Sequence, residues 1–90
     1  MAQFAVIGLG RFGATASLEL MKMGHQVLGV DADPKLVDKY ADRLTRTVIA
    51  DVSDSAAVEE LGFENYDVVL VAIGEDVQAS LLSVVHLQTL

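Results

Sequence analysis

The sequence has 90 residues, 52% of them hydrophobic, with one proline, no cysteine and a formal net charge of −7. This composition is typical of one small globular domain, and it excludes a disordered chain, a disulfide framework and a thiolate metal site. The negative charge argues against binding of nucleic acid or an anionic membrane surface, because both require clustered Lys and Arg, and no stretch approaches the roughly 20 apolar residues of a membrane span.

A strand, a helix and a second strand are predicted at the start of the chain. Residues 3–8 are expected to form a buried strand, and the segment from Arg11 to Met23 a helix that ends at Gly24. Residues 26–31 form the next predicted strand. Together these segments make one right-handed βαβ unit of ordinary length.

The same alternation continues through the middle of the chain. Asp33 is predicted to cap a helix with Pro34 at its first position, where the missing N–H of proline costs nothing, and this helix runs to about Leu44. A short strand over residues 47–50 and a helix over residues 55–61 follow.

The last third of the chain is strongly apolar. After Gly62 stops the third helix, residues 68–73 form a predicted fourth strand that is apolar at nearly every position, which indicates burial on both faces. A last helix is expected from about Val77 to Leu90, and it carries no charge. A helix that is apolar all round is normally buried, so we expect it to pack on further sequence or on a second subunit.

These elements predict an α/β fold, a Rossmann-like parallel sheet with helices on both faces and the strand order 3-2-1-4. This order makes only the first half of a doubly wound sheet plus one strand. We therefore expect residues 1–90 to be the N-terminal portion of a larger nucleotide-binding domain, truncated before the remaining strands and a C-terminal lobe. The fourth strand is then expected to be an open apolar edge, which favours self-association.

The link between the first strand and the first helix carries the strongest motif. Residues 8–13 have the sequence Gly-Leu-Gly-Arg-Phe-Gly, a G-x-G-x-x-G pattern with a strand before it and a helix after it. In a dinucleotide-binding turn, Gly8 permits the tight turn, Gly10 lets a phosphate approach bare backbone, and Gly13 lets helix and strand pack closely. The helix would direct its unpaired N–H groups and its positive dipole end at that phosphate.

A carboxylate stands where a nucleotide site requires one. Asp31 ends the second predicted strand, 18 residues after Gly13, and is expected to bind the ribose hydroxyls of an adenosine. An NADP preference is disfavoured, because Asp31 would repel a 2′-phosphate and the next residues, Ala32 and Asp33, supply no arginine.

Five further residues are candidates near the same edge of the sheet. Arg11 and Phe12 lie inside the glycine turn, and the Arg11 guanidinium either reaches a phosphate or stays in solvent. Asp51 ends the third predicted strand, where it either faces an adenine or caps the turn that follows. Asp33 either contacts the ribose or only caps its own helix. Gly74 ends the fourth strand, beside the point where the strand order reverses.

No catalytic or metal-binding group accompanies these candidates. His25 and His86 have no second histidine or carboxylate at metal spacing, and both are expected to be structural. We find no nucleophile paired with a base, and carboxylates in a cleft do not alone make a catalyst. The sequence therefore predicts a binding protein and not an enzyme.

Several segments beyond the glycine turn share a recognisable pattern. They are Phe-Ala-Val-Ile-Gly-Leu-Gly-Arg-Phe-Gly at 4–13, Val-Asp-Ala-Asp at 30–33, Val-Ile-Ala-Asp at 48–51 with Asp54 and Leu-Gly at 61–62, and Val-Leu-Val-Ala-Ile-Gly at 69–74 with Gln-Ala-Ser at 78–80. In these segments the chain resembles the N-terminal lobe of the RCK (regulator of potassium conductance), or TrkA-N, domains. It is most similar to the cytosolic Ktr gating subunits of bacterial potassium uptake systems.

The resemblance implies regulation. In that family a Rossmann-like lobe binds ATP, ADP or NAD(H), lobes assemble as dimers into a ring, and the ring docks on the cytoplasmic side of a potassium-translocating membrane protein. By position, the glycines of the turn would cradle phosphates, Arg11 would contact the terminal phosphates, Asp31 the ribose and Asp51 the adenine region. The protein would then be cytoplasmic, peripheral on the inner face of the membrane through its partner.

Two other interpretations stay open. The Gly-Leu-Gly-Arg turn followed by residues 24–27, Gly-His-Gln-Val, also occurs in the cofactor half of NAD-dependent hydroxyacid dehydrogenases, which need a substrate domain and a catalytic Lys or His. An oligomerisation module that has lost its ligand is the third interpretation, and the intact pattern of glycines and acid disfavours it.

Overall fold

The computed structural model describes residues 2–72, 84 and 85. In chain order its elements are β1 (Gln3–Ile7), α1 (Arg11–Lys22), β2 (Gln26–Asp31), α2 (Pro34–Tyr40), β3 (Arg46–Ile49), α3 (Ser55–Leu61), the 3-10 helix η1 (Phe63–Asn65), β4 (Val68–Val71) and β5 (Val84–Val85). Strand and helix alternate up to β4, as the hydrophobic pattern predicts.

The sheet has the strand order β3-β2-β1-β4-β5. β1 is central and pairs in parallel with β2 and β4, and β2 pairs in parallel with β3. Ala5 and Val6 in β1 are both 0% exposed, as continuous apolarity in a parallel sheet requires. The predicted Rossmann-like sheet with the order 3-2-1-4 is therefore confirmed.

The prediction of a helix from Val77 to Leu90 is wrong at Val84 and Val85. These two residues form β5, which runs antiparallel to β4 with Val85 opposite Val69 and Val84 opposite Leu70. Two β-branched residues favour the extended backbone, and an edge strand offers them unpaired N–H and C=O groups. β4 is consequently not the open edge that we expected. The other residues of the predicted helix lie outside the described residues, as do positions 73 and 74.

Backbone hydrogen bonds form turns at the C-terminal ends of α1 and α2. After Lys22, the N–H of Gly24 donates to Met21 O (3.0 Å) and that of His25 to Leu20 O (3.1 Å), the double bond pattern of a Schellman motif. α2 ends at Tyr40, earlier than the predicted Leu44, and the chain continues as a turn in which the N–H groups of Arg43 and Leu44 both donate to Tyr40 O. This turn brings the Leu44 side chain into the core, where it is 6% exposed.

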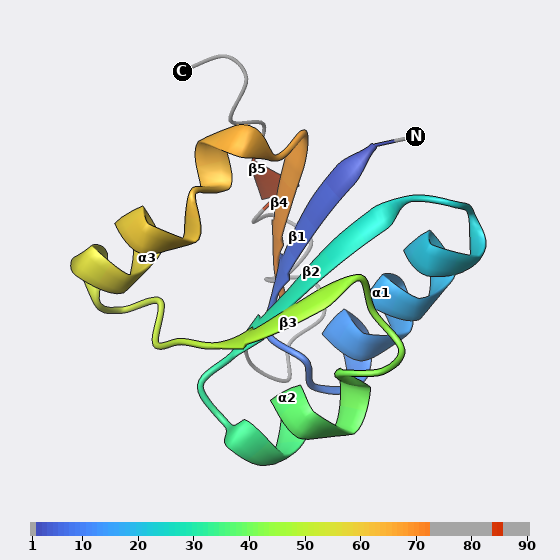
Figure 1. The fold of residues 1–90 in the computed structure, drawn as a ribbon, viewed down its shortest axis with the longest axis horizontal. Helices are drawn as coiled ribbons and strands as arrows, with labels where there is room; N and C mark the ends of the chain where they lie inside the picture. The colour runs from blue at the N-terminus through green and yellow to red at the C-terminus, as the bar shows by residue number, and fades with distance from the viewer. Residues whose placement is uncertain (1, 73–83, 86–90) are drawn as a thin grey trace.

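Helices cover both faces of the sheet, with α1 and α2 on one face and α3 on the other (Figure 1). The core of the α1/α2 face contains Val6, Leu9, Val27, Leu44 and Leu70. The core of the α3 face contains Ala5, Ile7, Leu28, Val30, Phe63 and Val69. Successive residues of β1 thus enter opposite layers, because side chains alternate along a strand.

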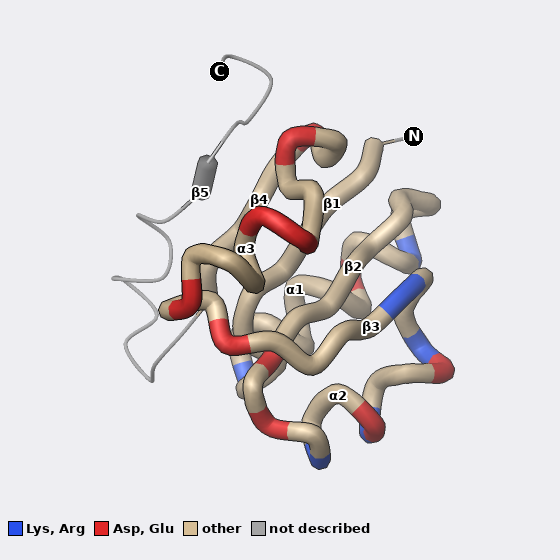
Figure 2. Tube along the Cα trace, turned by 60° about the vertical axis from the view of Figure 1, so that its left-hand side comes forward, with Lys and Arg blue, Asp and Glu red and all other residues tan. Residues whose placement is uncertain are grey.

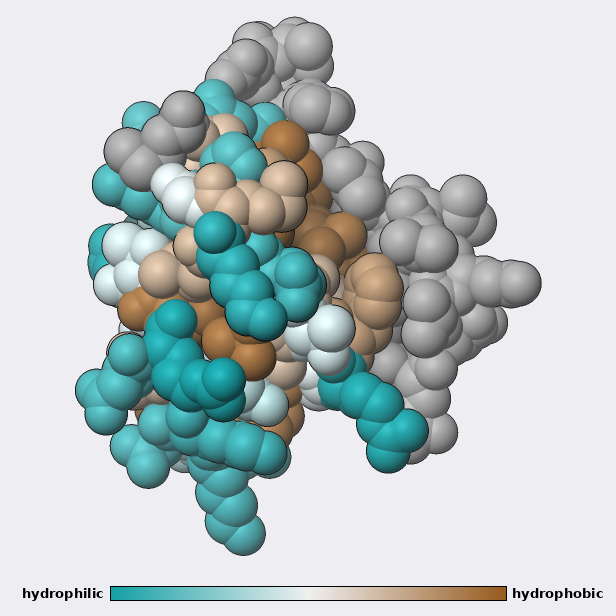
Figure 3. Space-filling model, turned by 90° about the vertical axis from the view of Figure 1, so that its right-hand side faces the viewer, coloured by the Kyte–Doolittle hydropathy of each residue, from teal (hydrophilic) through white to brown (hydrophobic). Residues whose placement is uncertain are grey.

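An apolar groove lies beside α1. Apolar side chains reach the surface among hydrophilic ones on this side of the molecule (Figure 3). The groove has a volume of about 350 Å³ and is lined by Phe4, Ala16, Glu19, Leu20, Val68 and Leu70. It belongs to the α1 side of the sheet, away from the carboxyl ends of the strands.

Candidate nucleotide site

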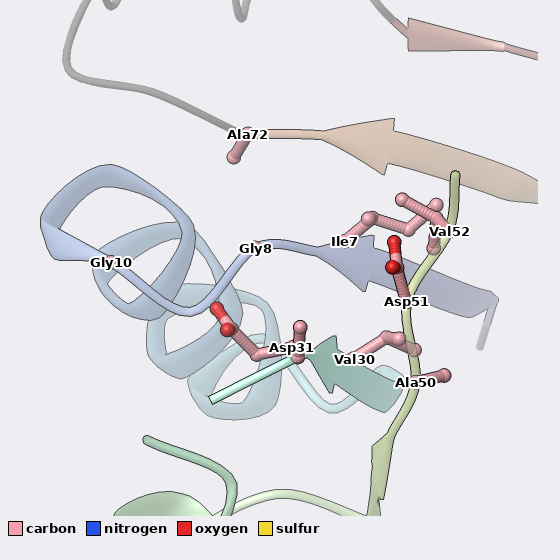
Figure 4. A pocket seen from close by; sticks show the side chains of 10 residues that line it. Ile7, Gly8, Gly10, Val30, Asp31, Ala50, Asp51, Val52 and Ala72 are labelled. Carbon is pink, nitrogen blue, oxygen red and sulfur yellow. The ribbon is translucent and has the colours of Figure 1, made fainter. Parts of the chain in front are cut away.

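A pocket of about 270 Å³ opens at the carboxyl ends of the parallel strands (Figure 4). It is lined by Ile7, Gly8, Gly10, Val30, Asp31, Ala32, Ala50, Asp51, Val52 and Ala72. Every one of the four parallel strands contributes residues at or just beyond its end. Because β1 separates β2 from β4, the pocket lies where the strand order reverses, the usual ligand crevice of doubly wound sheets.

The glycine turn forms one wall of the pocket. Gly8 has φ +103°, a conformation that L side chains rarely adopt, and its N–H donates to Val30 O at 2.7 Å, which holds the turn against β2. A Cβ at Gly13 would lie 1.7 Å from Gly8 O, so only glycine lets α1 approach β1 this closely. A Cβ at Gly10 would meet nothing within 4 Å, so the backbone there faces open space.

The start of α1 directly follows the lining residue Gly10 and has N–H groups without a partner in the helix. Its N-cap is Gly10, which has no side chain to accept from the first turn. The N–H of Ala14 donates to Gly10 O at 2.9 Å, so the N–H groups of Arg11, Phe12 and Gly13 precede the helical ladder. Donors of this kind, together with the helix dipole, bind anions such as phosphate.

Asp31 forms the opposite wall and is already engaged by the protein. Its Oδ2 accepts from the N–H of Leu9 at 2.7 Å, and its Oδ1 accepts from the N–H of Asp33 at 2.8 Å. Figure 4 shows the carboxylate turned toward the loop between Gly8 and Gly10. An ionised carboxylate has about four lone-pair sites, so two acceptor positions stay available for hydroxyl groups of a ligand.

Asp51 stands beyond the end of β3, between the apolar lining residues Ala50 and Val52. Its Oδ1 accepts from the hydroxyl of Ser53 at 2.7 Å and from the Ser53 N–H at 2.9 Å. Both hydrogen bonds lower the pKa of the Asp51 carboxyl, and the bond from the Ser53 hydroxyl has the larger effect. This carboxyl is therefore ionised at neutral pH. The wall is thus an apolar surface with one fixed negative charge.

Other predicted site residues do not line the pocket. Arg11 is exposed at the start of α1, and Phe12 is half-buried and packs on the core of the α1/α2 face. Asp33 is exposed, and its Oδ1 accepts from the N–H of Lys35 at 2.9 Å, which is the predicted capping role. Gly13 serves the packing of α1 on β1. Gly74 lies outside the described residues.

The two histidines were expected to be structural. The Nδ1 of His25 accepts from the N–H of Ala2 at 3.1 Å, and its ring contacts Phe4 edge-on with a centroid separation of 5.0 Å. This places His25 at the amino ends of the strands, away from the pocket, where it contacts Ala2 and Phe4. His86 lies outside the described residues. Within residues 2–72, 84 and 85 there is also no group of three or more His, Cys, Asp or Glu that could hold a metal ion.

Sequence reasoning missed the apolar half of the pocket. Ile7, Val30, Ala72 and Val52 line it, yet each resembles an ordinary core residue in the sequence. Ala72 is positioned by its N–H, which donates to Ile7 O at 2.7 Å at the end of β4. Only their place at the carboxyl ends of the predicted strands could have identified them, because residues there face the ligand crevice of a parallel sheet.

Charge is distributed unevenly around this site. Every charged residue between positions 47 and 72 is Asp or Glu, whereas Lys35, Lys39, Arg43 and Arg46 gather along α2 and the start of β3 (Figure 2). An anionic ligand in the pocket would therefore depend on backbone N–H groups at close range more than on the surrounding side chains. No helix in the described part of the chain is long and apolar enough to cross a membrane.

Known proteins share both the sequence and the fold. The family model of the TrkA-N domain matches residues 4–90. Ktr system potassium uptake protein A of Bacillus subtilis (strain 168) is 47% identical over 88 residues, which are 98% of this chain and 40% of that protein. N5-carboxyaminoimidazole ribonucleotide synthetase of Thermotoga maritima has a TM-score of 0.68 and 26% identity, over 90% of this chain and 22% of that one. UDP-glucose-4-epimerase of Stenotrophomonas maltophila, with bound NAD, has a TM-score of 0.66 and 29% identity, over 89% of this chain and 27% of that one.

These similarities agree with the geometry of the pocket. The two solved structures share the Rossmann-like sheet with this chain, and the Bacillus relative is similar along almost all of it. The chain spans 40% of the length of that relative. Because the family model extends from residue 4 to residue 90, the chain belongs to the TrkA-N domain family.

Proposed function

We propose that this domain binds an adenine nucleotide, ATP, ADP or NAD(H), in the pocket at the carboxyl ends of the strands. One observation carries the proposal: open backbone at Gly10, the N-cap of α1, the Asp31 carboxylate and the apolar residues Ala50 and Val52 line the same pocket. Phosphate, ribose and base need these three kinds of surface, in this order, from the helix to β3. The epimerase of similar fold has NAD bound, which supports the nucleotide class.

Each candidate residue receives a role in this proposal. The phosphates lie over Gly8 and Gly10, with Arg11 exposed nearby to contact the terminal phosphates. The ribose hydroxyls donate to the remaining lone pairs of Asp31, and the adenine lies near Asp51. Phe12 and Gly13 support the turn from within. Gly74, which is outside the described residues, stays a predicted contact of the ligand. Asp33 acts through its cap on α2.

We further propose that nucleotide binding regulates potassium transport. The support is the TrkA-N family and the similarity to the Bacillus relative, a potassium uptake protein of the Ktr system. The domain would act as a homo-oligomer, a dimer within a ring, on the cytoplasmic face of a potassium-translocating membrane subunit. A nucleotide changes such a ring only if it binds two ring states with different affinity, so ATP, ADP and NAD(H) need not act alike.

The alternative is the cofactor-binding half of an NAD-dependent dehydrogenase. The shared fold with an epimerase that has NAD bound favours it. The site offers it no catalytic group: the two pocket carboxylates, Asp31 and Asp51, are bound to backbone N–H groups and to the Ser53 hydroxyl. The described residues that line the pocket include neither the Lys nor the His that such an enzyme needs.

Titration calorimetry with ATP, ADP, NADH and NADPH tests the proposal. We expect binding of at least one of the first three, and weaker binding of NADPH than of NADH, because Asp31 repels a 2′-phosphate. A parallel assay measures NADH oxidation with small oxo acids. No binding of any of the four would overturn the proposal, and steady oxidation would favour the dehydrogenase.

A further inference from the structure

Leu9 is the residue of the glycine turn that the protein holds most firmly. Its side chain is 1% exposed and lies in the core of the α1/α2 face. Leu9 also packs closely on Gly29, where a Cβ would lie 3.1 Å from Leu9 Cδ2 and 2.7 Å from Leu44 Cδ1. The side chain of Leu9 therefore fixes one side of the turn, between Gly8 and Gly10.

The backbone of Leu9 is fixed by a different element. Its N–H donates to Asp31 Oδ2 at 2.7 Å, a contact that joins residues 22 positions apart in the chain. A hydrogen bond to an ionised acceptor is short and roughly twice as strong as a neutral one. The second oxygen of Asp31 accepts from Asp33 N–H at 2.8 Å, so the carboxylate cannot turn away without losing a bond.

This geometry also decides which donors a phosphate can use. The N–H of Leu9 points at Asp31 and is not available, whereas the N–H groups of Arg11 and Phe12 precede the helical ladder. The Leu9–Asp31 bond thus sets the direction in which the turn leaves β1 and enters α1. A turn without it would have Leu9 anchored by its side chain alone.

We propose that Asp31 is a positioning residue for the phosphate half of the site, in addition to its proposed contact with the ribose; this inference rests on the proposed nucleotide function. Its carboxylate holds the glycine turn in the form that presents the N–H groups of α1 to an anion. Asp31 should therefore matter for a ligand that has phosphate and no ribose.

Inorganic pyrophosphate is the probe that separates the two roles. If Asp31 contacted only the ribose, Asp31→Asn would remove one negative charge beside the site, and pyrophosphate would bind equally well or more tightly. If Asp31 positions the turn, Asp31→Asn places an NH₂ group opposite the N–H of either Leu9 or Asp33, and that hydrogen bond is lost. Pyrophosphate then binds more weakly, although the variant repels it less. The two roles predict opposite signs.

The experiment compares pyrophosphate affinity in the wild-type chain, Asp31→Asn and Asp54→Asn. The control, Asp54→Asn, removes the same charge outside the pocket lining and keeps a good N-cap residue on α3. We expect Asp31→Asn to weaken pyrophosphate binding about tenfold, the effect of one lost charge-assisted bond, and Asp54→Asn to leave it unchanged or slightly tighter. Unchanged or tighter binding in a folded Asp31→Asn protein overturns the positioning role.

A second measurement needs no variant. Pyrophosphate binding to the wild-type chain should slow hydrogen exchange of the Leu9 amide, because the ligand and the Asp31 bond stabilise the same form of the turn. Unchanged exchange at saturation overturns the inference even if Asp31→Asn fails to fold. If the wild-type chain binds a nucleotide and these tests fail, only the positioning role is wrong. If it binds neither nucleotide nor pyrophosphate, the proposed function fails as well.

Discussion

Replacement of Gly13 by alanine tests the close approach of α1 to β1. The added Cβ would lie 1.7 Å from Gly8 O, 2.9 Å from Gly8 C and 3.3 Å from the Cβ of Ala72. To restore a 3.0 Å separation from the carbonyl oxygen, the helix start and the turn must move apart by about 1.3 Å. Both contacts with Gly8 are with backbone, so no side-chain rotation relieves them.

The cost of this movement follows from its surroundings. Overpacking of a tight core costs about 1–3 kcal/mol, and the better helix propensity of alanine returns at most about 1 kcal/mol. We expect a net loss of about 1–2 kcal/mol for Gly13→Ala, which lowers the Tm of a domain of this size by about 4–16 °C. Nucleotide binding should be lost too, because the displaced turn includes Gly8.

Thermal unfolding followed by circular dichroism measures the effect, and Gly10→Ala is the matched control. Gly10 has φ −72°, and its Cβ would meet nothing within 4 Å, so we expect only the cost of a poorer N-cap, about 0.5–1 kcal/mol. Its methyl group nevertheless enters the space proposed for phosphate, so binding should fall at least tenfold in a folded protein. A Tm for Gly13→Ala within about 2 °C of the wild type would refute the packing argument.

Three further predictions concern the other acids and the cofactor. Asp54→Ala removes the oxygen that accepts from Ala56 N–H at 3.0 Å at the start of α3, and should lower the free energy of unfolding by about 1 kcal/mol in urea denaturation; Asp54→Asn, which keeps a good cap, should not. Ser53→Ala removes the larger of the two bonds that depress the pKa of Asp51, so NMR titration should show that pKa rise toward its ordinary value; an unchanged pKa would contradict the assigned cause. A carboxyl whose pKa is lower in the folded than in the unfolded protein stabilises the fold at pH values above the unfolded pKa, and this contribution is lost as the pH falls through the folded pKa. The wild type should therefore be more stable than Ser53→Ala near neutral pH, and the two free energies of unfolding should converge in acid. Asp31→Ser should reduce the ratio of NADH affinity to NADPH affinity, which calorimetry measures. The same ratio in the variant and the wild type would mean that the 2′-hydroxyl of the ribose does not contact Asp31.

Much of the fold could be predicted because local signals and the sheet pattern agree. β2 has the predicted bounds of 26–31, and Asp33 caps α2 with Pro34 at the first position, as expected. Gly62 ends α3 in the left-handed conformation that its position implied. At each of these places one residue type has a distinct chemical reason to be there.

The prediction of a C-terminal helix failed because that segment has no such residue. An uncharged apolar run does not distinguish a buried helix from a buried strand, and the pairing of Val84–Val85 with β4 depends on an edge outside that run. α2 is also shorter than predicted, and the turn after it carries Leu44 into the core. The pattern within one segment does not record such contacts with other segments.

The candidate site was predicted by its glycines and acids, and the structure adds how they are connected. Gly8, Gly10, Asp31 and Asp51 come together around one pocket, from three different strands. The bond from Leu9 N–H to Asp31 could not be anticipated, since it depends on the relative height of two parallel strand ends. The contribution of Ala72 depends likewise on the register between β1 and β4.

Amide chemical-shift mapping during a titration with ADP tests the central claim most directly. If the nucleotide binds in this pocket, the largest shifts should fall on Gly10, Arg11 and Phe12, with further shifts at Ala32 and Val52, while Ala2 and Gln26 at the opposite edge of the sheet stay unchanged. Shifts that gather around the groove of Phe4 and Leu20, or no shifts at millimolar ADP, would contradict the account.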